Sequence, residues 1–338
     1  MKNIVICCDG TANRFTEESK NTNVVKLFCS LEKDDPAHQV TYYDPGVGTR
    51  DMSNFSDWFD RATGSGVKSN IKQAYQYLMD SYEEGDRIFL FGFSRGAYTV
   101  RALSGMVNRC GLLPKRNVNL IDDAFYYYSS PKVDKKLAAS FKENFSREVS
   151  IHFLGVWDTV KAVFTGRLRK GYFRDNHLAD NVRHACQALS IDEQRGLFRP
   201  VLWDQHDPAR QTLDQVWFAG VHSDVGGSYA EAGLSNITLQ WMFRQGLVRG
   251  LRLKPGTLNN PNFQPNPGDV LHLSRVQGWR LLPRHQRPIP PQSALHVSIL
   301  ERLGEARYYP PNLRGTPEEL RAQYRFVDIS TCAELPVG

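Results

Sequence analysis

Short apolar runs occur along the chain, and each of them ends in polar or turn-forming residues. Runs of this length that are rich in β-branched and aromatic side chains are typical of buried strands. Five runs fit this pattern: Ile4–Cys8, Val40–Tyr43, Ile88–Phe91, Ile151–Val156 and Val216–Val221. They predict a buried sheet of at least these strands.

Helical spacing of apolar residues flanks the third run on both sides. One helical pattern extends from Val67 to Leu78, before that run, and another extends from Ala97 to about Val107, after it. Strands that alternate with helices are typical of a mostly parallel sheet covered by helices. The pattern therefore predicts the α/β class.

Polar residues follow every predicted strand. In parallel α/β sheets, functional groups gather beyond the carboxyl ends of the strands. The segments at these ends are, in chain order, Asp9-Gly10-Thr11, Asp44-Pro45-Gly46-Val47-Gly48, Ser94, Asp158-Thr159 and His222-Ser223-Asp224. A serine, a histidine and several carboxylates are thus expected at one edge of the sheet.

The third strand leads into Gly92-Phe93-Ser94-Arg95-Gly96. A buried strand, a tight G-x-S-x-G turn and a helix together form a nucleophile elbow, which exposes the serine hydroxyl above the sheet. Side chains at the two glycine positions would clash in so tight a turn. We therefore expect Ser94 to be the nucleophile of a serine hydrolase with an α/β-hydrolase-like fold. The structural alternative is a turn in which the serine only caps the helix.

A serine hydroxyl needs a base to take its proton and a carboxylate to orient that base. In α/β-hydrolases the acid and the histidine follow the serine in chain order. Ser94 with Asp158 and His222 fits this order, and both partners directly follow predicted strands. Asp224 with His296 is the second set, and mixed combinations such as Asp158 with His296 also remain open.

An oxyanion hole needs two backbone N–H groups directed at the developing negative charge. We expect one to be the amide of Arg95, directly after the nucleophile. The second is expected from Gly10 or Thr11, in the loop that follows the first strand.

Two other interpretations concern the carboxylates of this edge. Asp9 could be a phosphotransferase nucleophile, but that motif needs a second aspartate two residues later, where Thr11 stands. Asp9, Asp158 and Asp224 could instead form a metal site. The favoured hydrolase needs neither a metal nor another cofactor.

Composition limits the partners and the compartment. The net charge of +6 is spread along the chain, so it does not indicate a nucleic-acid-binding protein, although it would suit contact with an anionic membrane surface. Six cysteines without paired spacing suggest a reducing compartment. The sequence shows neither a signal peptide nor a run of about 20 apolar residues, so we expect a cytoplasmic protein as synthesised, exported if at all by a signal-independent route.

Four short segments of the sequence, one of which contains the serine motif, resemble segments of a known family. The chain resembles the DUF2235 family of α/β-hydrolases, which includes the catalytic domain of type VI secretion phospholipase effectors of the first lipase class. The resemblance runs from about residue 1 to residue 302 and is carried by Cys8–Thr11, Gly92–Tyr98, Gly155–Val160 and Gly220–Gly227. It implies hydrolysis of phospholipid acyl esters by a Ser-Asp-His triad at Ser94, Asp158 and His222. The segment Ala294–Ser298 also resembles a recurrent family segment, which keeps His296 open as the base.

We therefore expect a single α/β-hydrolase domain over residues 1–338, with insertions around 115–147 and 228–292 that form a cap over the site. The expected activity is acyl hydrolysis of lipid esters, similar to that of a phospholipase A. The expected partners are a lipid or other acyl ester, a membrane surface contacted peripherally, and an immunity or secretion protein. The alternatives are a non-lipid carboxylesterase or thioesterase and a catalytically silent binding module.

Overall fold

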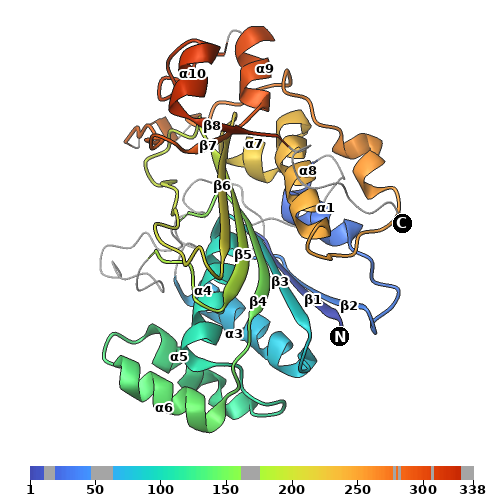
Figure 1. Cartoon of the computed structure of the whole chain (residues 1–338), viewed down its shortest axis with the longest axis vertical. Helices are drawn as coiled ribbons and strands as arrows, with labels where there is room; N and C mark the ends of the chain where they lie inside the picture. Colours follow the sequence, from blue (N-terminus) through green and yellow to red (C-terminus); the bar gives the residue numbers. More distant parts are fainter. Residues whose placement is uncertain are drawn as a thin grey trace.

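One parallel sheet organises the molecule (Figure 1). The computed structural model describes residues 1–10, 20–46, 64–160, 176–276, 279–280, 283–305 and 308–328. Within these residues the sheet has eight strands in the order β2-β1-β3-β4-β5-β6-β7-β8, and every neighbouring pair is parallel. The strands are β1 (Asn3–Cys8), β2 (Gln39–Asp44), β3 (Arg87–Phe93), β4 (Ile151–Trp157), β5 (Val182–Ser190), β6 (Thr212–Phe218), β7 (Ala294–His296) and β8 (Arg325–Val327).

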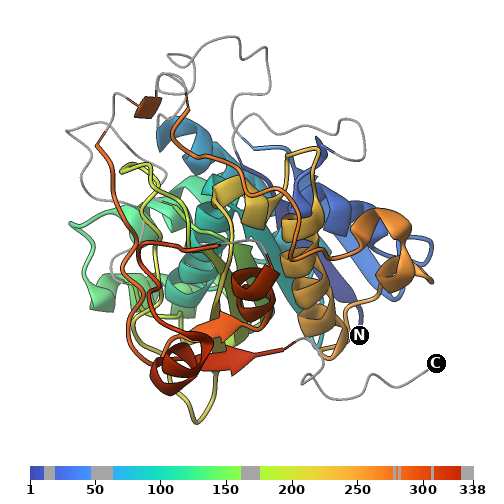
Figure 2. The same ribbon diagram turned by 90° about the horizontal axis from the view of Figure 1, so that it is seen from above.

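Helices cover both faces of this sheet (Figures 1 and 2). The α-helices are α1 (Asn23–Ser30), α3 (Gly64–Ser81), α4 (Arg95–Cys110), α5 (Ile121–Ser129), α6 (Lys135–Phe145), α7 (His222–Gly226), α8 (Gly233–Leu247), α9 (Ser298–Glu305) and α10 (Pro317–Gln323). Short 3-10 helices are η2 (Val118–Leu120), η3 (Thr257–Asn259) and η4 (Pro261–Phe263). None of the helices in the described ranges is both long and apolar enough to cross a bilayer.

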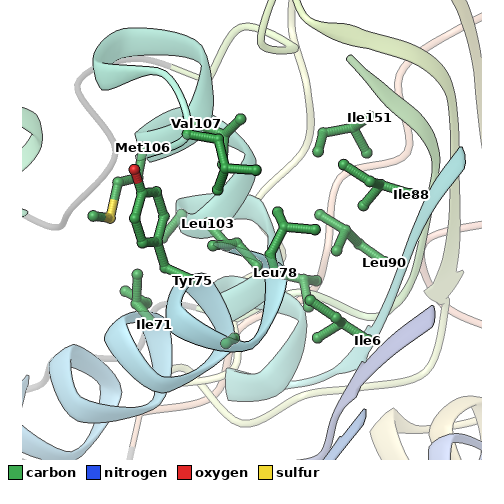
Figure 3. Packing of buried hydrophobic residues seen from close by; sticks show 14 of the residues in the cluster. Ile6, Ile71, Tyr75, Leu78, Ile88, Leu90, Leu103, Met106, Val107 and Ile151 are labelled. Atoms are coloured by element: carbon green, nitrogen blue, oxygen red, sulfur yellow. The ribbon is translucent and has the colours of Figure 1, made fainter. Parts of the chain in front are cut away.

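Strand β3 shows why both faces need a helical layer. Successive side chains of a strand point to opposite faces. Ile88 and Leu90 pack with α3 and α4 in one buried cluster, which Figure 3 shows from close by. Phe89 and Phe91 pack with α1 and α8 in a second cluster on the opposite face. Since the strand is apolar on both sides, it lies in the interior of the sheet.

The five predicted strands are present, and the predicted α/β class is confirmed. Strand β6 ends at Phe218, three residues before the predicted end, so His222 lies on α7 and not directly after a strand. His296 is the last residue of β7, and α9 starts only at Ser298. Strands β5, β7 and β8 were not predicted.

The segment 115–147 does not lie over the carboxyl end of β3. It forms α5 and α6, which pack on the half of α4 farthest from Ser94. Arg109 Nε donates to the carbonyl of Tyr127 at 2.9 Å, and the Cys110 thiol donates to the carbonyl of Ala124 at 3.3 Å. From residues 228–292, the other expected insertion, His272 bonds to Asp224 and Arg287 bonds to Asp158.

Candidate active site

Ser94 stands in a strained turn between β3 and α4. Its φ of 58° and ψ of −118° are rarely adopted by residues other than glycine, and such strain is frequent at functional sites. Its amide donates to the carbonyl of Trp157 at 3.0 Å, and its carbonyl accepts from the amide of Tyr98 at 3.2 Å. The Ser94 side chain makes no capping bond to α4, in contrast to the structural alternative.

Two glycines permit this turn. A Cβ atom at Gly96 would lie 2.0 Å from the carbonyl oxygen of Cys8, and one at Gly92 would lie 2.6 Å from the backbone of Gly96. Carbon atoms in proteins do not approach backbone atoms so closely, so both positions require glycine. The elbow therefore packs directly on the end of β1.

His222 is the first residue of α7, and its two ring nitrogens contact two different elements. Nε2 lies 2.9 Å from Oγ of Ser94, and Nδ1 lies 2.5 Å from Oδ2 of Asp158. A carboxylate can only accept, so Nδ1 carries the proton, and Nε2 is left to accept the Ser94 hydroxyl proton in the neutral ring. The structure thus brings Ser94, His222 and Asp158 together in one hydrogen-bonded chain.

Asp158 directly follows β4, is fully buried and has a φ of 41°. Its Oδ1 accepts from the amide of Ser190 at 3.1 Å. The guanidinium of Arg287 contacts both carboxylate oxygens, with Nη1 at 2.6 Å from Oδ1 and Nη2 at 3.0 Å from Oδ2. Arg287 was not predicted, because it lies in a proline-rich loop without a periodic pattern or motif.

The protonation states follow from this arrangement. Burial by itself would raise the pKa of Asp158, but the charge of Arg287 and the hydrogen bond from His222 outweigh it and hold the pKa below its ordinary value. Burial lowers the pKa of His222, although the hydrogen bond to Asp158 opposes this effect. An ionised carboxylate beside a neutral imidazole is therefore the resting state at neutral pH.

Aromatic rings enclose His222. The ring of Phe93 lies 4.6 Å from the imidazole, and the ring of Phe198 lies 4.9 Å away in an edge-on orientation. The guanidinium of Arg195 lies 3.6 Å above Phe198 and is paired with Glu193 at 2.8 Å. Glu193 also accepts from the backbone amide of His222 at 3.3 Å. These contacts fix the ring plane and limit the access of water to it.

The second set of predicted residues is not assembled with Ser94. Asp224 accepts from the amide of Val221 at 3.0 Å and pairs with His272 Nδ1 at 2.7 Å. His296 Nδ1 contacts Ser298, and its ring stacks on Phe218 at 4.9 Å. Burial lowers the pKa of His296 to about 4, so this histidine is neutral at physiological pH.

The predicted oxyanion donors have different surroundings. Arg95 is the first residue of α4 and directly follows Ser94, so its amide belongs to the same turn as the nucleophile. The amide of Gly10 donates to the carboxylate of Asp9 at 2.7 Å, so it would have to leave that bond to meet an oxyanion. Thr11 lies outside the described residues.

The three carboxylates considered as metal ligands have separate partners. Asp9 accepts from the hydroxyls of Thr22 at 2.6 Å and Tyr43 at 3.1 Å, while Asp158 and Asp224 bind the residues named above. Among the residues that the structure describes, no group of three His, Cys, Asp or Glu side chains could hold a metal ion.

Comparison with known families identifies the family of this chain. Residues 2–245 match the family described as type VI secretion system phospholipase effector Tle1-like, catalytic domain. The chain belongs to this family. The matched residues of this Tle1-like chain include Ser94, Asp158 and His222, whereas His296 and Arg287 lie beyond them.

Individual relatives cover the Tle1-like chain in part. The uncharacterized protein YEL023C of Saccharomyces cerevisiae is 36% identical over an alignment of 221 residues, and the match covers 59% of this chain and 32% of the yeast protein. An uncharacterized protein from Pseudomonas aeruginosa, of known crystal structure, has a TM-score of 0.48 at 17% identity, covering 94% of this chain and 52% of that one. The Tle1 effector, in its structure bound to the VgrG spike of the type VI secretion system, has a TM-score of 0.41 at 18% identity. This match covers 69% of this chain and 52% of the effector chain. The chain thus spans about a third of the yeast protein and about half of each solved chain.

Proposed function

We propose that this Tle1-like chain is a serine hydrolase that cleaves the carboxylic esters of lipids, with a phospholipase A-like activity. The observation that carries the proposal is the hydrogen-bonded chain from Ser94 through His222 to Asp158, in a family described as phospholipase effectors. A nucleophile, a base and an orienting carboxylate in hydrogen-bond contact are the groups that acyl transfer requires.

In the proposed reaction, Ser94 Oγ attacks the acyl carbonyl carbon while His222 Nε2 takes its proton. The tetrahedral intermediate collapses, and the imidazolium gives that proton to the leaving alcohol, so that an acyl-Ser94 ester remains. Water, deprotonated by His222, then attacks the ester carbonyl carbon. The imidazolium returns the proton to Ser94 Oγ as the acyl–oxygen bond breaks, and the fatty acid is released. Asp158 keeps the imidazole in the correct tautomer and stabilises its transient positive charge.

The oxyanion of the intermediate is proposed to meet the amide of Arg95, which belongs to the same turn as the nucleophile. Helix α4 begins at this amide, so the partial positive charge of a helix N-terminus lies at the same place. A second donor is proposed from the loop after β1, where Gly10 is the described candidate.

An exposed apolar loop beside the site supports a lipid substrate. Val270, Leu273 and Val276 expose 51%, 71% and 42% of their surface. His272 belongs to the same loop and binds Asp224, two residues after His222. Apolar side chains that project beside a site of this kind suit contact with a lipid surface, since they lose their exposure to water there.

Labelling with a fluorophosphonate probe tests the proposal, followed by hydrolysis assays on phospholipid vesicles and on a short-chain soluble ester. We expect one labelled serine, Ser94, and faster hydrolysis of the vesicle substrate. A preference for the soluble ester would instead indicate a non-lipid esterase or thioesterase. The absence of labelling in the folded protein would indicate a silent binding module.

A further inference from the structure

The guanidinium of Arg287 and the carboxylate of Asp158 form a buried ion pair at the centre of the site. We propose that Arg287 is a positioning residue that holds the Asp158 carboxylate charged and directed at His222. This inference rests on the proposed function of Ser94, Asp158 and His222. It adds an ionic partner of the acid, supplied by a segment far from the nucleophile in the sequence.

The guanidinium of Arg287 binds the carboxylate of Asp158 in a bidentate contact, a fork of two hydrogen bonds. Each terminal nitrogen of Arg287 reaches a different oxygen of Asp158, and Oδ2 is also the oxygen that accepts from His222. A planar guanidinium that binds both oxygens fixes the plane of the carboxylate as well as its charge. Rotation of the Asp158 side chain would break both bonds to Arg287, so the fork directs Oδ2 at the imidazole.

Arg287 is itself held in place. It is 1% exposed, and Nη1 also donates to the hydroxyl of Ser190 at 2.7 Å, while Nη2 donates to the carbonyl of Phe198 at 2.6 Å. The side chain of Asn312 donates to the carbonyl of Arg287 at 2.9 Å. A guanidinium fixed at this many points is preorganised to orient its partner.

Asp158 and Glu193 both accept hydrogen bonds from His222, and each of these carboxylates is paired with an arginine. Asp158 is paired with Arg287, and Glu193 is paired with Arg195. Loss of the Arg287 charge would leave one uncompensated carboxylate against the imidazole. That carboxylate would favour the imidazolium and raise the pKa of His222, so the base would be protonated over more of the neutral range.

The test compares Arg287→Gln, which removes the charge, with Arg287→Lys, which keeps the charge but loses the fork. The pKa of His222 is measured by NMR titration of its ring, and the rate of fluorophosphonate labelling of Ser94 is measured between about pH 4 and pH 9. We expect Arg287→Gln to move both the titration and the acid limb of the labelling rate upward by about one pH unit. Arg287→Lys should leave both midpoints in place and slow labelling about tenfold, because the carboxylate is less well oriented.

Arg101→Gln is the matched control, because Arg101 is also buried but bonds to the carbonyl of Val201 and stacks on Trp203. Arg101→Gln should shift neither the midpoint of the His222 titration nor the midpoint of the acid limb of the labelling rate. Unchanged midpoints in folded Arg287→Gln would overturn the inference while leaving the proposed function intact. Absence of labelling in the wild type would contradict the proposed function, and the His222 titration would still test the role of Arg287. If Arg287→Gln does not fold, a shifted His222 titration in Arg287→Lys contradicts the inference.

Discussion

The imidazole of His222 lies 2.9 Å from the hydroxyl of Ser94, although 128 positions separate the two residues in the chain. The contact joins the turn after β3 to the start of α7, and three strands of the sheet lie between these points in the sequence. A bond of this length between a hydroxyl and a neutral imidazole nitrogen allows direct proton transfer.

Replacement of Ser94 by alanine should abolish labelling and lower ester hydrolysis by about 10³-fold or more, because no other group can form the acyl-enzyme. The fold should be unchanged, since the Ser94 side chain makes no capping bond to α4. Ser104→Ala, in the same helix, is the control and should retain full activity. Thermal unfolding and steady-state hydrolysis check both variants, and hydrolysis by Ser94→Ala at the wild-type rate would exclude Ser94 as the nucleophile.

The two candidate histidines should respond in opposite ways. His222→Ala should lower the rate by about 10³-fold or more, because the base is lost. His296→Asn should keep the rate within a few fold, since its ring contacts Ser298 and Phe218 and not Ser94. A large loss of rate in folded His296→Asn would instead return His296 to the reaction.

His296 should also make the fold sensitive to acid. Its pKa is lowered from 6.5 to about 4 by burial, so the folded state binds fewer protons than the unfolded state between these values. The free energy of unfolding of the wild type should therefore fall as the pH decreases from about 6.5 to about 4, by up to about 3 kcal/mol from this residue. His296→Asn should lack this part of the decrease in urea titrations at pH 7 and pH 4.5. Parallel decreases in both proteins would contradict the assignment.

Asp192 should have the reverse pH dependence. Burial raises its pKa from 3.8 to about 6, so the folded state binds more protons than the unfolded state, and stability is lost as the pH rises through this range. One oxygen, Oδ2, accepts both from Tyr308 and from the amide of Gly220, so an asparagine oxygen can replace it. Asp192→Asn should therefore be more stable than the wild type at pH 8, by up to about 3 kcal/mol, with a smaller gain at pH 5. Urea unfolding at the two pH values measures this, and an equal gain at both would argue against an ionised Asp192.

Gly96→Ala tests the packing of the elbow. The new methyl group would meet the carbonyl oxygens of Cys8 and Asp9 at 2.0 Å and 2.5 Å, and backbone atoms of a central strand cannot easily move away. We expect a loss of about 3 kcal/mol or more in the free energy of unfolding. Gly268→Ala, whose nearest new contact is 3.4 Å away, should stay within about 0.5 kcal/mol of the wild type. Equal stability of the two variants in urea would contradict the close packing.

Local patterns were sufficient to predict some parts of the molecule. The nucleophile turn, Asp158 and His222 follow runs whose residues are strongly apolar, so their positions could be inferred from where those runs end. Strand β5 was missed because it begins with Val182-Arg183-His184 and includes small and polar residues, such as Gln187, that the fold buries. Its burial comes from neighbours on both sides of the sheet, which a linear pattern does not contain.

Arg287 was missed for a different physical reason. A buried arginine is stable only when a partner compensates its charge, and that partner is 129 positions away. Proline-rich loops have no periodicity that would indicate which side chain points inward. The same limit applies to Gly10: its loop follows the strand beside β3, but the bond of its amide to Asp9 could not be foreseen from the sequence.

The position of Arg287 in the chain has a consequence for biosynthesis. When residues up to about 245 have left the ribosome, Ser94, Asp158 and His222 are all present, yet the cation beside Asp158 has still to be synthesised. We expect a nascent chain at this stage to be inactive, because Asp158 has neither its charge partner nor its fixed orientation. The proposed hydrolytic activity would then begin only late in synthesis, once the segment that carries Arg287 has been added to the chain.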